Sequence, residues 1–322
     1  MSTTATSDSS SPAHRGNSFS GLPNKLVRAA NGIDYAYRDT GPGASGPSAS
    51  GPGASGPGAS GGAPLVLFQH FRGNLDNWDP ALIDALAPAR RVITFDNTGV
   101  GGSTGATPGT VEQMAYDAIA FLAAMDLGQA DLLGFSIGSF VAQQIALTRP
   151  ASVRRLILAS AAPQGAAGMH GWAPEVIGAI GTPETSPGAY LSVFFTGSPA
   201  SRQAGVEALQ RMHARTQDRD AETTWATREA QYDAVCTWGI PDHALLQRLS
   251  GLEMPVFVAN GDSDPMIAPH YSYLLAGLIR QARVKIYPDS AHGFLFQHHA
   301  DFAADVEDFL SDPSLTGAGG PA

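Results

Sequence analysis

Strand-like and helix-like segments alternate along most of this chain, and that alternation constrains the fold more than any other feature. Residues 65–68 read LVLF, a continuous apolar run typical of a strand buried on both faces. Residues 110–127 carry apolar side chains at helical spacing, with Thr110 as a suitable N-cap. Strands that alternate with helices indicate an α/β fold, with a mostly parallel central sheet and helices on both faces. The other segments expected to follow this pattern are strands at 91–95, 131–135, 153–161, 256–259 and 284–287, and helices at 76–87, 137–148, 271–279 and 301–310.

Two segments depart from the alternation. Residues 25–30 and 33–38 are strand-like and flank Asn31-Gly32, a dipeptide that favours a two-residue hairpin turn. We therefore expect an antiparallel hairpin at one edge of the sheet. Residues 164–240 carry helix-like stretches and no convincing strand, which predicts an inserted helical cap. The cap would separate two halves of one domain, residues 24–163 and 241–312.

Glycine and proline are concentrated in one stretch of the chain. Of 37 Gly and 23 Pro in total, 9 Gly and 4 Pro lie in residues 41–62. This segment contains only Gly, Pro, Ala and Ser, in near-repeats of GPGAS. Such a segment cannot bury a core, so we expect a flexible insert inside the first half of the domain. Residues 1–23, rich in Ser and Thr, and residues 313–322 are predicted to be disordered tails.

Charge and cysteine content narrow the possible partners. The 19 basic and 29 acidic side chains give a net charge of −10, which argues against a surface for nucleic acid or anionic membranes. Cys236 is the only cysteine in the sequence, so internal disulfides and multi-cysteine metal sites are excluded. No apolar run of membrane-spanning length and no signal-peptide core is present, so we expect a cytoplasmic protein. A small molecule is the expected partner, and nothing in the sequence indicates an oligomeric state.

The sharpest motif is GFSIG at residues 134–138, a G-x-S-x-G match. The predicted strand 131–135 precedes Ser136 and the predicted helix 137–148 follows it, so the serine lies in a tight strand-to-helix turn. Such a turn exposes the hydroxyl above the sheet edge, and the helix N-terminus favours developing negative charge. A glycine-rich turn with a passive serine is the alternative. The strand and helix on either side favour a nucleophilic Ser136.

With this motif in this context, the chain resembles an α/β-hydrolase over residues 24–312. In that family the catalytic triad runs Ser…Asp/Glu…His in chain order. Residues 260–265 follow a predicted strand and read NGDSDP, which resembles the family's acid loop and implies Asp264 as the triad acid. Asp262 is the runner-up, and either aspartate could instead cap the loop.

The same resemblance implies a histidine after the last strand. Residues 288–294 read PDSAHGF and resemble the family's histidine loop, which implies His292 as the general base. The resemblance also implies an oxyanion hole, with the backbone N–H of Ile137 as one donor. Aligning Trp78 with a tryptophan common in relatives implies the backbone N–H of Phe71 as the second donor.

The chain departs from the family pattern at two loops. Relatives usually have His-Gly before the second oxyanion donor, whereas this chain has Gln69-His70. His70 and Arg72 either add polar contacts to the pocket or pack the loop. Residues 96–103 read DNTGVGGS and resemble the family's D-x-R-G-x-G-x-S loop, with Thr98 where arginine is usual. We expect this loop to be structural, because its glycines do not have the spacing of a phosphate-binding loop.

A serine nucleophile excludes some of the enzyme classes that occur in this family. Dehalogenases and epoxide hydrolases of the family use aspartate at the elbow, so Ser136 favours esterases, lactonases, thioesterases, C–C hydrolases or cofactor-free haloperoxidases. Aromatic residues in the predicted cap favour a small to medium apolar carboxylic ester or lactone, cleaved through an acyl-enzyme. No cofactor and no metal ion are expected. A non-hydrolytic ligand-binding protein and a haloperoxidase or perhydrolase remain as alternatives.

Overall fold

The computed structural model describes residues 18–41 and 62–315. These residues form an eight-stranded sheet with the order β1-β2-β4-β3-β5-β6-β7-β8. Strands β3 to β8 pair in parallel, whereas β1 pairs with β2, and β2 with β4, in the antiparallel sense. The predicted α/β fold with its antiparallel edge is therefore confirmed. The strands are β1 (Lys25–Arg28), β2 (Asp34–Asp39), β3 (Leu65–Phe68), β4 (Val92–Phe95), β5 (Ala130–Phe135), β6 (Val153–Ala159), β7 (Val256–Gly261) and β8 (Ala282–Tyr287).

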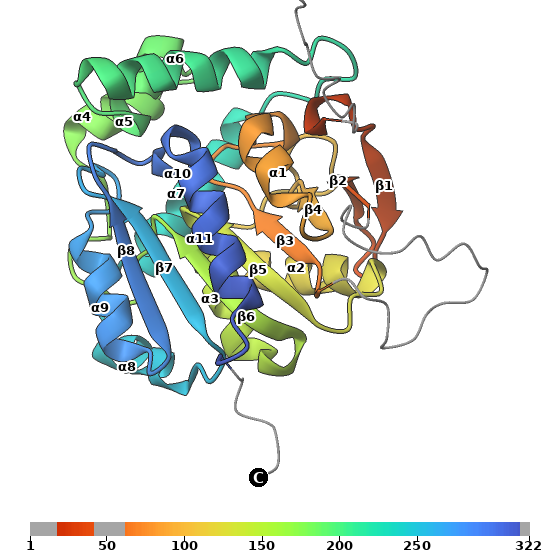
Figure 1. Ribbon diagram of the computed structural model, residues 1–322, viewed down its shortest axis with the longest axis vertical. Helices are drawn as coiled ribbons and strands as arrows, with labels where there is room; N and C mark the ends of the chain where they lie inside the picture. Colours follow the sequence, from red (N-terminus) through yellow and green to blue (C-terminus); the bar gives the residue numbers. More distant parts are fainter. Residues whose placement is uncertain (1–17, 42–61, 316–322) are drawn as a thin grey trace, which may run out of the picture.

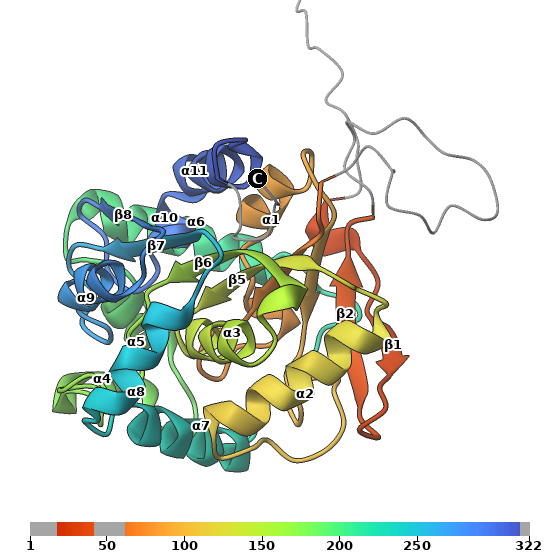
Figure 2. The same ribbon diagram turned by 90° about the horizontal axis from the view of Figure 1, so that it is seen from below.

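Helices cover both faces of this sheet (Figures 1 and 2). Helices α1 (Pro80–Leu86) and α11 (His299–Ser311) pack together on one face. Helices α2 (Val111–Ala124), α3 (Ile137–Thr148) and α9 (His270–Leu278) lie on the other face. The helices begin where the sequence supplies a cap, as at Thr110, whose hydroxyl accepts the backbone N–H of Gln113 at the start of α2.

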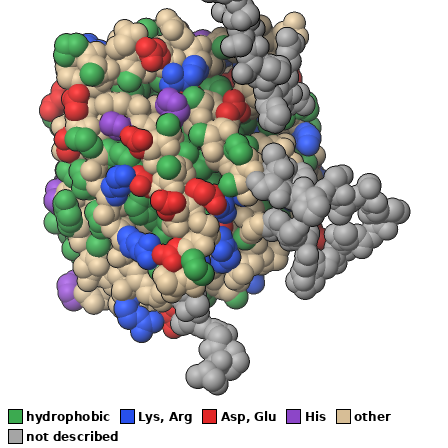
Figure 3. All heavy atoms as spheres, viewed as in Figure 1, with side chains coloured by type: hydrophobic (Ala, Val, Ile, Leu, Met, Phe, Trp, Pro, Cys, Tyr) green, Lys and Arg blue, Asp and Glu red, His purple; other side chains and the backbone are tan. Residues whose placement is uncertain are grey.

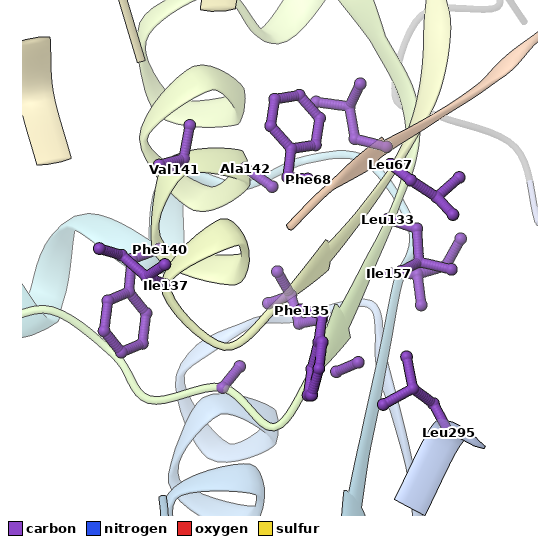
Figure 4. Close-up of a cluster of buried hydrophobic side chains, with 14 of the residues drawn as sticks. Leu67, Phe68, Leu133, Phe135, Ile137, Phe140, Val141, Ala142, Ile157 and Leu295 are labelled. Atoms are coloured by element: carbon purple, nitrogen blue, oxygen red, sulfur yellow. The ribbon is translucent and has the colours of Figure 1, made fainter. Parts of the chain in front are cut away.

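The core lies between the sheet and these helices. Leu67, Leu133 and Ile157 occupy paired positions on three adjacent parallel strands, so they form one row on one face of the sheet. Figure 4 shows this row, with Phe68 turned the other way towards Ala142 of α3. All five side chains are fully buried. Parallel strands covered on both faces bury every side chain, which explains the continuous apolar runs in the sequence.

Residues 164–240 contain helices α4 (Pro174–Ile180), α5 (Pro187–Phe194), α6 (Pro199–His213) and α7 (Trp225–Trp238), which we call the cap. Helices α4 to α6 each begin with proline at the first helical position, where its missing N–H costs no hydrogen bond. They lie together beyond one end of the sheet, whereas α7 packs against α2 and α3 (Figure 1). Two short helices, α8 (His243–Gln247) and α10 (Phe294–Gln297), complete the set of described α-helices.

Two local expectations are wrong. The helix predicted at 76–87 begins only at Pro80, because the Asp79 carboxylate accepts the backbone N–H of Ala81 and caps it. The predicted N-terminal tail ends earlier than residue 23, since Phe19–Gly21 form a 3₁₀ turn and Phe19 is buried under the Arg38 guanidinium. Most of the predicted tails and nearly all of the 41–62 insert lie outside the described residues.

The surface carries mixed charges. On the face seen in Figure 3, basic and acidic side chains are interspersed, and no large field of one sign covers it. Among the helices of residues 18–41 and 62–315, none combines the length and the apolar character needed to cross a bilayer.

Candidate active site

Ser136 lies in the turn between β5 and α3. Its backbone has φ 57° and ψ −125°, a conformation that residues other than glycine rarely adopt. The Ser136 N–H donates to the Ala159 carbonyl at 3.0 Å, which ties the turn to the end of β6. This hydrogen bond helps to hold the strained backbone, as expected for a serine presented at the end of a strand.

The two glycines of the motif are required by close backbone contacts. A Cβ atom at Gly134 would lie 2.5 Å from Cα of Ser139 in the first turn of α3. A Cβ atom at Gly138 would overlap the carbonyl group of Phe68 at the end of β3. The start of α3 therefore contacts both its own strand and the loop after β3, and no larger residue fits at either position.

Asp264 and His292 are brought together by the loops that follow β7 and β8. His292 Nδ1 lies 2.8 Å from Asp264 Oδ2, and both side chains are almost completely buried. The other carboxylate oxygen of Asp264 accepts the backbone N–H groups of Met266 and Ile267 at 2.8 and 3.0 Å. Three hydrogen bonds thus orient the carboxylate, and an ionised carboxylate only accepts, so Nδ1 of His292 carries its hydrogen.

Asp262, the other aspartate considered from the sequence, has a different role. Its carboxylate accepts the backbone N–H of Asp289 at 2.9 Å and that of Ser290 at 3.2 Å. It therefore links the acid loop to the histidine loop and does not contact His292. Asn260, which the sequence reasoning missed, also supports this region: its Oδ1 accepts the Ser160 hydroxyl, which also lies 3.3 Å from the carbonyl oxygen of His292.

The His292 ring contacts two phenylalanine rings, one of them directly before Ser136 in the sequence. Its centroid is 5.1 Å from that of Phe135, the residue before the serine, and 5.3 Å from that of Phe194 on α5. His292 Nε2 is buried and has no hydrogen-bond partner within the described ranges. With Nδ1 bound to Asp264, this nitrogen carries the lone pair that a general base uses.

The two amides implied as oxyanion donors are both available. Neither Phe71 N–H nor Ile137 N–H donates a hydrogen bond to any part of the chain that the structure describes. Ile137 is the first residue of α3, where amides have no partner inside the helix. Because α3 contacts the end of β3 at Gly138, the loop with Phe71 and the start of α3 adjoin each other.

A cavity of about 650 Å³ separates the core from the cap. His70, Phe71 and His292 line it from the core, and Tyr190 and Phe194 of α5 line it from the cap. This volume is typical of a site for a small molecule. Ser136 is 2% exposed and does not itself line the cavity, whereas both of its implied partners, His292 and Phe71, do.

Arg72 joins the loop after β3 to the cap. Its guanidinium donates to the carbonyls of Thr182 at 2.7 Å and Pro183 at 2.6 Å. Its backbone N–H donates to Gln231 Oε1 at 2.7 Å, and Thr223 Oγ1 donates to its carbonyl at 2.6 Å. The sequence left Arg72 open between pocket contact and loop packing, and its guanidinium holds the cap loop that lines the cavity.

A second core-to-cap contact joins two carboxyl groups. Asp96 Oδ1 and Asp220 Oδ2 both lie near the backbone N–H of Leu75, at 2.9 and 3.3 Å. Burial, and then the hydrogen bond and charge of Asp220, raise the pKa of Asp96 well above its usual value. Asp96 therefore binds a proton more readily than an isolated carboxyl group does. No group of three or more His, Cys, Asp or Glu side chains is placed to hold a metal ion within residues 18–41 and 62–315.

Known proteins resemble this chain over most of its length. A family model described as alpha/beta hydrolase fold matches residues 63–299. A poly(3-hydroxyalkanoate) depolymerase of Ectopseudomonas oleovorans is 30% identical over 250 residues, which cover 77% of this chain and 84% of that protein. A protein of Mycobacterium tuberculosis, named provisionally as a non-heme bromoperoxidase, is 25% identical over 260 residues, 78% of this chain and 95% of its own length.

A solved structure extends the similarity. The alpha/beta hydrolase fold protein from Chitinophaga pinensis is 34% identical to this chain and superposes with a TM-score of 0.81. The match covers 92% of this chain and 100% of that protein. The fold similarity therefore includes the core and the cap together.

Proposed function

The chain belongs to the alpha/beta hydrolase fold family, and from that premise we propose that it is a serine hydrolase that cleaves carboxylic esters. Ser136 would be the nucleophile, His292 the general base and Asp264 the residue that orients it. The observation that carries the proposal is the buried 2.8 Å contact between His292 and Asp264, with His292 Nε2 left unpartnered beside the strained turn at Ser136.

The chemistry follows from these groups. His292 Nε2 takes the proton of the Ser136 hydroxyl as Oγ attacks the ester carbonyl carbon. The carbonyl oxygen becomes negatively charged, and the N–H groups of Phe71 and Ile137 stabilise it. When the tetrahedral intermediate collapses, the ester C–O bond breaks and the leaving alcohol receives the proton from His292. Asp264 keeps the imidazole in the required tautomer and stabilises its charged form.

The second half of the reaction uses water. A water molecule attacks the acyl group on Ser136 and gives a proton to His292 Nε2. The bond between the acyl carbon and Oγ then breaks, the carboxylic acid leaves and the proton returns to Ser136. The serine hydroxyl and the neutral histidine are regenerated.

The cavity supports a small or medium substrate. Its volume of about 650 Å³ suits a molecule of that size, and Phe71, Phe194 and Met266 give it apolar wall area. The name of the depolymerase relative refers to a polyester, so an ester bond, in a linear ester or a lactone, is the preferred target.

Removal of the serine tests the proposal. Ser136→Ala should lower p-nitrophenyl ester hydrolysis by at least about 10³-fold and abolish labelling by a fluorophosphonate. Ser192→Ala, at an exposed serine of α5, is the matched control and should keep both activities. Undiminished turnover in Ser136→Ala would refute the proposal. Ligand-induced stabilisation of the native protein without labelling or turnover would instead indicate a binding protein.

A peroxide-dependent reaction is a second candidate, favoured by the name of the bromoperoxidase relative. In it, hydrogen peroxide replaces water in the attack on the acyl-enzyme and releases a peracid, which can oxidise bromide. Acetate- and peroxide-dependent bromination that disappears in Ser136→Ala would support it. Bromination equal in both proteins would exclude Ser136 from that reaction.

A further inference from the structure

His70 is a buried polar residue at the cavity that the triad and the oxyanion donors do not use. It follows β3, directly before Phe71, and is 6% exposed. Its ring lies edge-on between Phe135, at a centroid distance of 5.3 Å, and Phe194, at 5.2 Å. Since Phe135 and Phe194 are also the ring neighbours of His292, the two histidines share one aromatic enclosure beside Ser136.

The hydrogen bonding of His70 determines which of its nitrogens is an acceptor. Nδ1 lies 2.9 Å from the carbonyl oxygen of Phe71, and a carbonyl only accepts, so Nδ1 carries the hydrogen. Burial lowers the pKa of His70 to about 3, so the ring is neutral at ordinary pH. Nε2 therefore presents a lone pair, and it has no partner in the described part of the chain.

A buried acceptor without a partner loses the hydrogen bond that it would make in water, so it is usually paired with a donor from a ligand or a water molecule. The carbonyl and alkoxy oxygens of an ester are themselves acceptors and cannot supply that donor. A hydroxyl group on the substrate can, because it carries a hydrogen.

The position of His70 indicates where that hydroxyl lies. Phe71, the next residue, supplies the amide implied to bind the carbonyl oxygen, and Phe135 precedes the nucleophile. Because His70 adjoins both of these residues, a donor bound at its Nε2 would lie near the reacting carbonyl, on the acyl side or the alcohol side. The acyl side remains attached to Ser136 after the alcohol has left, so only there does the contact persist through both halves of the reaction.

We propose that His70 is a substrate-binding residue whose Nε2 accepts a hydrogen bond from a hydroxyl group on the acyl chain, near the carbonyl. The protein would then prefer esters of hydroxy acids to the matching esters without the hydroxyl. This assignment rests on the proposed serine hydrolase activity, and it names the substrate class.

The test compares three small esters: ethyl 3-hydroxybutanoate, ethyl 2-hydroxybutanoate and ethyl butanoate. The rates are followed by acid release, and kcat/KM is measured for the native protein, His70→Gln and His70→Met. Gln and Met have similar size, but only Gln offers a strong acceptor at the end of its side chain. Both lose the bond to the Phe71 carbonyl, so the pair isolates the acceptor.

The native protein should prefer one hydroxy ester over ethyl butanoate by about 10- to 100-fold, the size expected for a site built to bind a hydroxyl. In His70→Met, the ratio of kcat/KM for the hydroxy ester to kcat/KM for ethyl butanoate should fall to about three or less. In His70→Gln, this ratio should recover partly. Each preference is a ratio within one protein, so a general loss of activity cancels.

Two results would overturn the proposal and leave the hydrolase assignment intact. One is equal kcat/KM for all three esters in the native protein, with turnover still lost in Ser136→Ala. The other is the same preference in His70→Met as in the native protein. If these esters are not turned over, or if His70→Met does not fold, the affinities of the three esters for Ser136→Ala are measured by calorimetry. A hydroxy ester that binds no more tightly than ethyl butanoate then overturns the proposal. Failure of the hydrolase assignment shows separately, as absence of fluorophosphonate labelling at Ser136.

Discussion

The two sides of the cavity are held in place by different kinds of contact. On the core side, backbone groups orient the reacting side chains: the N–H groups of Met266 and Ile267 fix the Asp264 carboxylate. On the cap side, side chains of two core loops hold the cap: Arg72 donates to carbonyls of the loop after α4, and Asp289 accepts the hydroxyls of Thr196 and Ser198. The core side therefore depends on the sheet, whereas the cap side depends on a few separable contacts.

Bond making and enclosure of the substrate therefore depend on different parts of the molecule. The groups that need fixed geometry for bond making follow parallel strands, whose positions are set by many backbone hydrogen bonds. The cap aromatics Tyr190 and Phe194 line the cavity and limit its size from the other side, away from the strand ends. Variants on the core side should therefore change catalysis by large factors, and variants on the cap side by small ones.

The largest effect is expected at the acid. Asp264→Asn keeps the shape of the side chain but removes the charge that fixes the His292 tautomer, so kcat should fall on the order of 10⁴-fold. Asp262→Asn, two residues away and bound to loop amides, should cost less than about tenfold. Ester hydrolysis measured for both variants checks the assignment, and the reverse order of effects would make Asp262 the triad acid.

Glycine substitutions test the rigidity of the two sides. Gly138→Ala forces a Cβ atom into the Phe68 carbonyl and should lower the free energy of unfolding by about 1–3 kcal/mol. Gly178→Ala, in the cap helix α4 with no atom within 4 Å of the added Cβ, should raise it by about 0.5–1 kcal/mol. Urea unfolding of both variants measures the contrast. A neutral Gly138→Ala would mean that the turn at Ser136 is not tightly packed.

The link between core and cap is tested at Arg72. Arg72→Gln removes the donors to the cap loop and should lower kcat/KM by about tenfold, which corresponds to about 1.4 kcal/mol. The effect should fall mainly on KM, because the loop lines the cavity and does not touch the reacting bond. Arg202→Gln, at an exposed arginine of α6, is the control and should leave both constants within twofold or so. A loss confined to kcat would place Arg72 in the chemistry.

The smallest effect is expected from the carboxyl pair. The raised pKa of Asp96 means that its contribution to stability is fully present below the unfolded value near 3.8 and is lost as the pH rises through the folded pKa. Asp220→Asn removes the neighbouring negative charge, which lowers the Asp96 pKa. The decrease in unfolding free energy as the pH rises from about 5 to about 8 should therefore be smaller in Asp220→Asn than in the native protein.

Urea unfolding at both pH values measures this change, and Asp233→Asn, at an exposed position of α7, serves as the control. An unchanged pH dependence in Asp220→Asn would show that Asp220 does not perturb Asp96.

The parts of the fold that the sequence predicted are those in which the backbone restricts residue type. Gly134 and Gly138 are needed because a Cβ atom would overlap neighbouring backbone, so the turn at Ser136 was visible as a pattern. Asn31-Gly32 similarly predicted the hairpin, in which Lys25 pairs with Tyr37. Its loop, however, has three residues and not two, because Ala29 donates its backbone N–H to the Ile33 carbonyl. The start of the helix predicted at 76–87 was placed too early, because several side chains before Pro80 could cap a helix and only the structure identifies Asp79 as the cap.

Patterns between near neighbours in the sequence are enough to predict the parallel sheet, its antiparallel edge and the serine in a strand-to-helix turn. Three other features became known only from the folded chain: Asp264 contacts His292, His70 Nε2 has no partner among the described residues, and Arg72 anchors the cap. These features depend on contacts between distant residues, such as Arg72 and Gln231, which are 159 positions apart. No local pattern encodes such a contact, because the partner is chosen by how the whole chain packs.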